Sequence, residues 1–233
     1  MTTHEHTALV VDDDASIRLI LCEALKNAGY ATNSAENGEM ALHKYIESFH
    51  DIIVTDYDMP GMNGIQLIDH LKRVEYNLPV LVTTGMSNPR ILEQLLKFPN
   101  LLILPKPFDE KILLQAVEKV MAGRTERNLA SRRKQVRIPI STTASTNSHG
   151  SVEVRNICLS GLGAHSQAKI PTGTGLTVAL ETDSCPLTLK AKTVWSHNHE
   201  CGMMFTEITA EESAALKQWL YFKLLKLDPC AGL

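Results

Sequence analysis

Acidic side chains follow two strongly apolar runs of the sequence, ALVV and IIVT. Asp12 and Asp13 come directly after the first of these runs, and Asp56 comes directly after the second. If both runs are parallel strands, their carboxyl ends open on the same edge of a sheet, where sites of such sheets form. Carboxylates gathered there repel one another, and a hard divalent cation with oxygen ligands relieves the repulsion. We therefore predict a magnesium site, whereas Asp14, directly before Ala15, is expected to cap a helix.

A hydroxyl and an ammonium group follow two further apolar runs, VLVT and LLIL. Thr84 comes after the first of these and Lys106 after the second, between Pro105 and Pro107. At the same rim, the cation and Lys106 can neutralise charge that develops while a phosphoryl group is transferred to a carboxylate. The arrangement predicts phosphoryl transfer to Asp56, with Thr84 and Lys106 as its partners.

A second group of candidate residues begins with arginines. Arg133 and Arg137 are four residues apart, so they point to one side of an extended segment and lie one turn apart on a helix. Guanidinium forks bind phosphate oxygens and guanine edges bidentately, and Arg132 adds a third fork. Further along, Asn156 can offer an amide to a base edge, and Gly161 lets a backbone approach closely.

The charge distribution favours a focused anion site at these arginines. Residues 1–122 carry 10 basic and 17 acidic side chains, whereas residues 123–137 carry six basic and one acidic side chain. An excess of positive charge that is confined to so short a segment is too local to form a general nucleic-acid-binding surface. The alternative is that segment 124–137 is a solvated helical extension whose charges bind nothing.

The composition and the absent motifs exclude several classes. The chain is 44% hydrophobic and 21% charged, which is typical of globular proteins and excludes a wholly disordered or fibrous chain. No apolar run approaches the roughly 20 residues that span a bilayer, so we expect no membrane insertion. Five dispersed cysteines without a Cys-x-x-Cys pair predict a reducing, cytoplasmic setting. The sequence contains no enzymatic motif, and no helix-turn-helix follows its first half. We therefore expect neither an enzyme nor DNA binding.

The first half of the chain alternates strand-like and helical patterns. Five such units indicate an α/β fold with a doubly wound, parallel, five-stranded sheet over residues 1–122. The predicted strands are residues 8–11, 30–33, 52–55, 80–83 and 101–104, and the helical spacings are residues 17–28, 40–45, 65–71, 91–96 and 112–120.

The second half changes character after a polar segment, residues 123–130, that we expect to be a helical linker. Short strand-like runs separated by turns then predict a small antiparallel β-barrel with a C-terminal helix over residues 131–227, followed by a tail, 228–233. The helix is expected at 211–225, with a capping box of Thr209 and Glu212. The predicted strands are residues 136–143, 152–158, 163–166, 176–180, 187–194 and 202–206, and residues 141–151 are expected to form a strand end and a hairpin loop.

Residues 7–122 resemble a response-regulator receiver domain of the CheY type, through LVVDDD, VTDYDMPGMNG, LVTTG and LPKPF in this order. The resemblance implies a flavodoxin-like strand order 2-1-3-4-5 and a sensor histidine kinase as partner. It implies that Asp56 accepts the phosphoryl group, that Thr84 and Lys106 sense it, and that the Lys106–Pro107 bond is cis. The implied Mg²⁺ ligands are Asp12, Asp13, Asp56 and the backbone carbonyl of Asp58.

One position departs from the receiver pattern. Ile103 lies three residues before the lysine, where the family has a switch aromatic. The usual coupling between hydroxyl movement and an inward-turning ring is therefore not available in its standard form.

Residues 131–225 resemble a PilZ domain, the family of cyclic di-GMP receptors. Its RxxxR motif is intact at Arg133 and Arg137, and its [DN]xSxxG motif reads NxCxxG from Asn156 to Gly161. The resemblance implies that both motifs and Arg132 bind cyclic di-GMP. The implied ligand-binding residues are Arg132, Arg133, Arg137, Asn156, Cys158 and Gly161. Cys158 replaces the serine, and a thiol is the poorer hydrogen-bond partner. The lost bond to a charged group costs about 1.5–3 kcal/mol, roughly tenfold or more in affinity.

The sequence therefore predicts a response regulator with two inputs, phosphorylation of Asp56 and cyclic di-GMP, acting on an unidentified downstream protein. Whether it forms a homodimer stays open. One alternative is an adaptor controlled by phosphorylation, whose barrel docks a protein and no longer binds nucleotide. Another is a phosphate sink with a passenger barrel. The His-x-His pairs at residues 4–6 and 197–199 have no accompanying carboxylate or thiol cluster in the sequence, and we expect them to be surface histidines.

Overall fold

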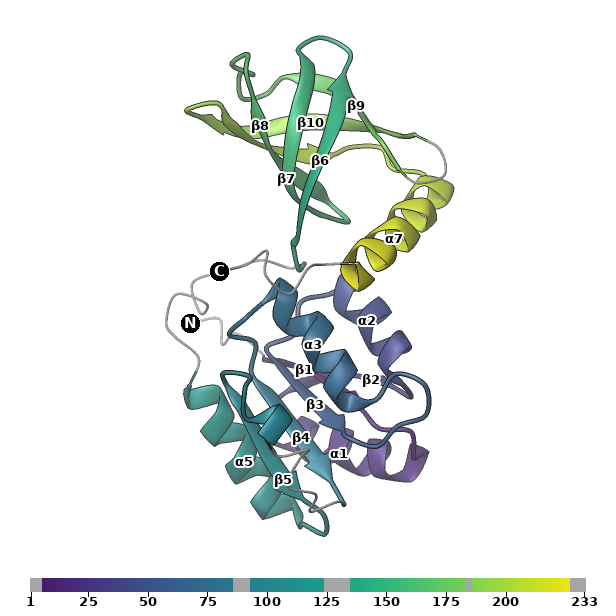
Figure 1. Ribbon diagram of the computed structural model, residues 1–233, viewed down its shortest axis with the longest axis vertical. Coiled ribbons are helices and arrows are strands. Elements are labelled where there is room, and N and C mark those ends of the chain that lie inside the picture. The colour runs from purple at the N-terminus through teal and green to yellow at the C-terminus, as the bar shows by residue number, and fades with distance from the viewer. Residues whose placement is uncertain (1–5, 86–92, 124–134, 183–185, 227–233) are drawn as a thin grey trace. The chain divides into compact units, whose positions relative to one another are not determined.

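Five short strands form the centre of the first of two compact units in the computed structural model (Figure 1). All neighbouring pairs are parallel, and the order β2-β1-β3-β4-β5 confirms the prediction. Every residue of β3 and β4 is buried, as expected where helices cover both faces of a sheet. The strands are β1 Thr7–Val11, β2 Ala31–Ala35, β3 Ile52–Asp56, β4 Val80–Thr84 and β5 Leu101–Pro105. The structure describes residues 6–85, 93–123, 135–182 and 186–226.

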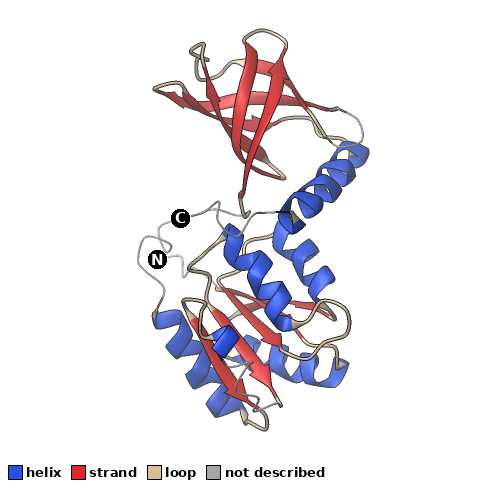
Figure 2. Ribbon diagram, viewed as in Figure 1, coloured by secondary structure: helices blue, strands red, loops and turns tan. Residues whose placement is uncertain are grey.

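Helices cover this sheet on both sides (Figure 2). On one side α1, Ala15–Asn27, and α5, Glu110–Ala122, pack their apolar stripes on β1 and β3. The helices α2, Gly38–Glu47, and α3, Gly64–Val74, contact each other. Each fully buried leucine, isoleucine or valine contributes about 1.5–3 kcal/mol, so this double covering stabilises the sheet edge that holds the acidic residues. The predicted helix at 91–96 lies partly outside the described residues.

Side-chain caps fix where these helices begin. Asp14 accepts hydrogen bonds from the backbone of Ser16 and Ile17, which confirms its predicted role at the start of α1. Asn63 and Gln66 form a reciprocal capping box at the start of α3. The first turns of both helices are thereby held next to the ends of β1 and β3.

The second unit, Gln135–Lys226, is a closed barrel of six antiparallel strands followed by one helix. Closure removes free strand edges, and alternate residues of each strand fill the interior. The order around the barrel is β10-β11-β8-β7-β6-β9. The elements are β6 Ile138–Thr146, β7 Gly150–Cys158, β8 Gly161–Ser166, β9 Gly175–Leu180, β10 Leu187–His197, β11 Glu200–Phe205 and α7 Ala210–Leu225.

The barrel confirms the predicted class and shifts two boundaries. Residues 141–151 are mostly strand, because the serines and threonines of β6 alternate between exposed and partly buried positions and only three residues connect β6 to β7. The strand β10 continues to His197, beyond the expected end at Val194, through a bulge between Thr193 and Trp195. Thr209 and Glu212 form the predicted capping box of α7. No helix among the described residues combines the length and apolarity needed to cross a membrane.

Gly161 is required by the pairing of β8 with β11. A Cβ atom at this position would lie 2.1 Å from the backbone oxygen of Met203. The close backbone approach predicted at this glycine is therefore an approach between two strands of the barrel.

We predict that Gly161→Ala lowers the free energy of unfolding of the barrel by about 1–3 kcal/mol, because the two backbones must separate to admit a methyl group. Chemical denaturation followed by tryptophan fluorescence measures this, since both tryptophans lie in the barrel unit. Gly175→Ala is the matched control, because no heavy atom lies within 4 Å of its Cβ position. Equal unfolding free energies for the two variants would contradict this reading of Gly161.

Candidate functional site

Three charged side chains meet where β1, β3 and β5 end. The Lys106 ammonium group lies 2.6 Å from Oδ1 of Asp56 and 3.1 Å from Oδ2 of Asp12. Asp12 is 1% exposed and Asp56 is 6% exposed, although both are carboxylates. The structure thus brings together three residues that lie 44 to 94 positions apart in the sequence, as the strand ends predicted.

Backbone groups fix the orientation of Asp56. The backbone N–H of Asp58 donates a hydrogen bond of 2.9 Å to its Oδ2. On the strand side, the hydroxyl of Thr83 donates to Oδ1 at 3.4 Å. A Cβ atom on Gly64 would lie 2.4 Å from the backbone oxygen of Asp56, so only glycine lets α3 begin this close to the aspartate. The Asp56 carboxylate is therefore held in one orientation, and the start of α3 packs closely against the Asp56 backbone.

Lys106 is positioned by the chain around it. Its backbone N–H donates to the backbone oxygen of Thr84 at 2.7 Å, which aligns the end of β5 with the end of β4. The Lys106–Pro107 bond is cis, as the sequence resemblance implied. Thr84 is 2% exposed at the same rim.

The charges in this pocket are out of balance. Burial raises the pKa of Asp12, and the nearby Lys106 offsets this only in part. Burial alone would lower the pKa of Lys106, but its hydrogen bond and charge interaction with Asp56, and then those with Asp12, raise it. Lys106 is therefore protonated, and one ammonium group faces two buried carboxylates.

This imbalance fits a divalent cation. Mg²⁺ binds proteins through one or two carboxylates and keeps water or phosphoryl oxygens as its other ligands. Asp12 and Asp56 supply buried carboxylates, and the backbone of Asp58 lies beside Asp56, whereas the side chains of Asp13 and Asp58 are exposed. Within the described ranges no three His, Cys, Asp or Glu side chains already converge on one metal position. The residues present therefore fit Mg²⁺ held by two carboxylates, the Asp58 carbonyl and water.

Thr83 is a contact of Asp56 that the sequence reasoning missed. The strand register could have predicted this contact. Thr83 of β4 is the direct partner of Asp56 on β3, and the side chains of opposed residues point to the same face of the sheet. Two consecutive threonines obscured which of them lies against the aspartate. At the predicted switch position, Ile103 is partly buried and pairs with Val82 of β4.

A second candidate site crosses the outer face of the barrel. The guanidinium of Arg137 donates a hydrogen bond of 2.9 Å to the side-chain oxygen of Asn156, which unites two predicted residues. Arg132 and Arg133 lie outside the described residues. Asn156 pairs with Gly163, Gly163 with Gly202, and Gly202 with Trp195, so these residues form one row across four strands.

Trp195 is a candidate site residue at the end of this row. Its side chain is 46% exposed, and its indole ring lies over Gly202, where a Cβ atom would be 2.0 Å from Nε1. At the other end of the row, the Asn156 amide lies over Gly163. Two adjacent glycines thus make room on this face for an amide and an exposed aromatic ring. Reading the glycines against the strand register could have found this row.

Cys158 is placed differently from the other predicted residues. It is 4% exposed, and its thiol lies 3.4 Å from the backbone oxygen of Gly161 and 3.4 Å from the hydroxyl of Ser160. The Ser160 side chain is exposed. The hydroxyl that Cys158 lacks is therefore present two residues later at the same turn.

Two family models match the chain. The response regulator receiver domain matches residues 8–118, and the PilZ domain matches residues 131–222. The first unit is 31% identical over 113 residues to sporulation initiation phosphotransferase F of Bacillus subtilis, covering 91% of that protein. It is 33% identical over 113 residues to chemotaxis protein CheY of Thermotoga maritima, covering 94% of it. Both alignments cover 48% of this chain.

Solved structures are similar to part of this chain. Chemotaxis protein CheY4 of Vibrio cholerae has a TM-score of 0.48 and 29% identity, over 50% of this chain and 99% of that one. NtrX of Brucella abortus has a TM-score of 0.50 and 23% identity, over 56% of this chain and 30% of that one, a likeness of fold alone.

We predict that Asp12→Asn raises the melting temperature of the first unit at neutral pH. The raised pKa of Asp12 means that the folded state binds this proton more tightly than the unfolded state, so stability is lost as the pH rises above about 4. The variant removes that loss, and its advantage should grow between pH 4 and pH 7. Differential scanning calorimetry without divalent cations measures it. Added Mg²⁺ should stabilise the wild type more than the variant, and a variant less stable than the wild type at pH 7 would contradict the charge imbalance.

Proposed function

Since the chain belongs to the response regulators, with a receiver domain followed by a PilZ domain, we propose that it integrates two signals. A sensor histidine kinase phosphorylates Asp56, and cyclic di-GMP binds to the barrel at Arg137 and Asn156. The protein acts by changing its affinity for a downstream protein and turns over no substrate of its own.

The contact of Lys106 with two buried carboxylates carries the first half of this proposal. Asp56 is the nucleophile: one carboxylate oxygen forms a bond to phosphorus while the bond from phosphorus to the imidazole nitrogen of the kinase breaks. Asp12 and Asp56 would hold Mg²⁺, which when bound would supply positive charge to the phosphoryl oxygens. Lys106 adds a second positive charge at 2.6 Å from Asp56. Asp58 donates its backbone N–H to the other oxygen and keeps the carboxylate in place.

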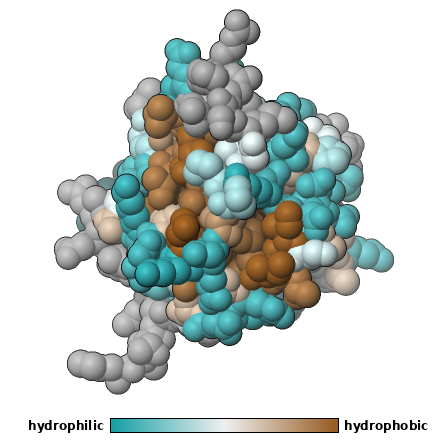
Figure 3. Space-filling view, turned by 90° about the horizontal axis from the view of Figure 1, so that it is seen from below, coloured by the Kyte–Doolittle hydropathy of each residue, from teal (hydrophilic) through white to brown (hydrophobic). Residues whose placement is uncertain are grey.

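Exposed apolar side chains beside this pocket support docking of the kinase. Leu19 and Ile20 on α1 are 59% and 63% exposed, and Ile112 on α5 is 45% exposed. Ile20 borders a groove of about 160 Å³ between α1 and α5, next to Phe108. Figure 3 shows apolar patches on the molecule seen from below, the end toward which β3, β4 and β5 point in Figure 1. An apolar surface at the helices that follow the acidic strand ends suits a helical kinase domain.

The row from Arg137 to Trp195 supports the second half. A guanidinium group binds phosphate oxygens or a guanine edge, and an amide reads the edge of a base. Gly163 and Gly202 leave room on this face for the Asn156 amide and the Trp195 indole, and the exposed indole offers a flat stacking surface. Cyclic di-GMP combines two phosphates with two purines, so each part of the row has a matching group.

The burial of Cys158 favours one alternative function. With the motif serine replaced by a buried thiol, the barrel loses a hydroxyl directed at the ligand, and a barrel without nucleotide would serve as a protein-docking module. Ser160 argues against the protein-docking module, because its side chain provides a hydroxyl at the same turn as Cys158.

We predict that Asp56→Asn abolishes phosphorylation by acetyl phosphate and Mg²⁺, since the nucleophilic carboxylate is lost. Intact-mass spectrometry detects the aspartyl phosphate. Asp14→Asn is the control, because asparagine also caps α1 and Asp14 is exposed. An unchanged phosphorylated fraction in Asp56→Asn would place the modification elsewhere.

We predict that the chain binds cyclic di-GMP in isothermal titration calorimetry and that Arg137→Ala removes measurable binding. Trp195→Ala should cost about 1–3 kcal/mol, roughly 5- to 150-fold in affinity, if the indole stacks on a base. Arg155→Ala is the control, because this exposed arginine on β7 pairs with Glu153. Absence of binding by the wild type would support the docking module, and equal binding by wild type and Arg137→Ala would reject this row as the site.

A further inference from the structure

A second row of polar side chains crosses the outer face of the barrel, next to the first. It alternates imidazole and carboxylate groups, and neighbouring members are direct cross-strand partners whose side chains point to the same face. His165 lies at its centre, two positions along β8 from Gly163. The row consists of His197, Glu200, His165, Glu153 and Thr143.

The turn between β10 and β11 adds another imidazole to this row. Asn198 and His199 both have positive φ angles, 46° and 67°, and the turn folds His199 back toward β8. The ring centroids of His165 and His199 are 6.1 Å apart, with their planes at 44°. Residues 34 positions apart in the sequence thus form an imidazole pair. The fold adds His165 of β8 to the His197–His199 motif and to the adjacent Glu200, which the spacing in the sequence did not predict.

Hydrogen bonds fix the protonated nitrogen of each ring. Nδ1 of His199 lies 3.1 Å from the backbone oxygen of Ser166, which can only accept, so Nδ1 carries the proton. Nδ1 of His165 lies 3.2 Å from a carboxylate oxygen of Glu200, which accepts in the same way. In the neutral form, both rings therefore present an unprotonated Nε2. Neither Nε2 has a hydrogen-bond partner in the part of the chain that the structure describes.

This arrangement matches that of metal-binding histidines. A histidine ligand commonly donates its second ring N–H to a carboxylate or a backbone carbonyl, which orients the ring and strengthens it as a ligand. With metal–nitrogen distances of about 2.0–2.1 Å, two imidazoles on one ion have ring centroids roughly 5–6.5 Å apart. The observed 6.1 Å lies within this range.

We propose that His165 and His199 bind one divalent transition-metal ion, Zn²⁺ or Cu²⁺, through their Nε2 atoms. Glu200 orients the His165 ring and the carbonyl of Ser166 orients the His199 ring, each through a hydrogen bond from Nδ1. Among the described residues, no third His, Cys, Asp or Glu side chain already converges with them, so water completes the coordination. Imidazole ligands select these ions over Mg²⁺, which prefers oxygen. The site is thus chemically distinct from the acidic pocket of the receiver domain.

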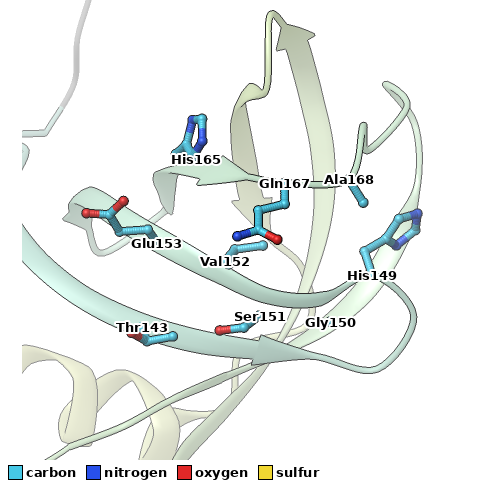
Figure 4. A pocket seen from close by; sticks show the side chains of 9 residues that line it. All are labelled: Thr143, His149, Gly150, Ser151, Val152, Glu153, His165, Gln167 and Ala168. Atoms are coloured by element: carbon cyan, nitrogen blue, oxygen red, sulfur yellow. The ribbon is translucent and has the colours of Figure 1, made fainter.

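A pocket lies next to His165, and neither His199 nor Glu200 lines it. It has a volume of about 590 Å³, and Glu153, Thr143 and Gln167 also line it. In Figure 4, His165 lies at one end of the pocket and His149 at the other. His149 therefore provides a histidine control on the same surface.

The test titrates the full chain with ZnCl₂ in isothermal titration calorimetry, in excess Mg²⁺ and in a His4→Gln/His6→Gln background that removes the other His-x-His pair. We expect one ion per chain. His165→Gln and His199→Gln should each lower the affinity at least tenfold, and Glu200→Gln should lower it by about 10- to 100-fold. His149→Gln should leave it unchanged. Circular dichroism establishes that each variant is folded.

A second measurement needs no further variants. The electron paramagnetic resonance spectrum of the His4→Gln/His6→Gln chain with one equivalent of CuCl₂ should show hyperfine coupling to two imidazole nitrogens. Unchanged Zn²⁺ affinity in both His165→Gln and His199→Gln, or a Cu²⁺ spectrum without coupling to two nitrogens, would overturn the proposal. Neither result would bear on nucleotide binding, which rests on a different row of the barrel.

Discussion

One ammonium group shared by two buried carboxylates is the interaction on which the receiver domain depends. Lys106 binds Asp56 and Asp12, yet burial still raises the pKa of Asp12, so the pocket keeps unbalanced negative charge. Such a pocket costs folding stability, and the apolar strands and helices around it offset that cost. Under the proposed function, a bound metal ion and then a phosphoryl group would change this charge balance in turn. The instability of the pocket would thus be part of what makes it responsive to these ligands.

In the barrel, the strand pairing determines which polar side chains lie together on the outer face of the closed sheet. Directly opposed residues share a face, so a row of partners from four or five strands becomes one continuous surface. In the row from Arg137 to Trp195, two glycines separate a charged end from an aromatic end. In the neighbouring row, His165 and Glu200 lie directly opposed. The register of the strands, and no single motif, therefore defines what this face can bind.

The sequence predicted what depends on local pattern and order. Apolar runs predicted four of the five parallel strands and a weaker run near Tyr30–Asn33 predicted the fifth, β2. The residues after the apolar runs predicted that Asp12, Asp56 and Lys106 meet. It did not predict features that depend on register between distant strands. The place of Trp195 over Gly202 follows from a bulge and a pairing that no local pattern encodes. The sequence predicted a close backbone approach at Gly161, and only the register identifies the approaching backbone as that of β11.

The charge imbalance in the acidic pocket is tested most directly by the affinity for Mg²⁺ in the wild type and in Lys106→Met. Methionine keeps an apolar stem of similar length and removes the positive charge that lies 2.6 Å from Asp56. If Lys106 and the metal compete for the same two carboxylates, isothermal titration calorimetry will show tighter Mg²⁺ binding by the variant. Weaker or unchanged binding would contradict the account, because Lys106 would then help to build the metal site or play no part in its charge balance.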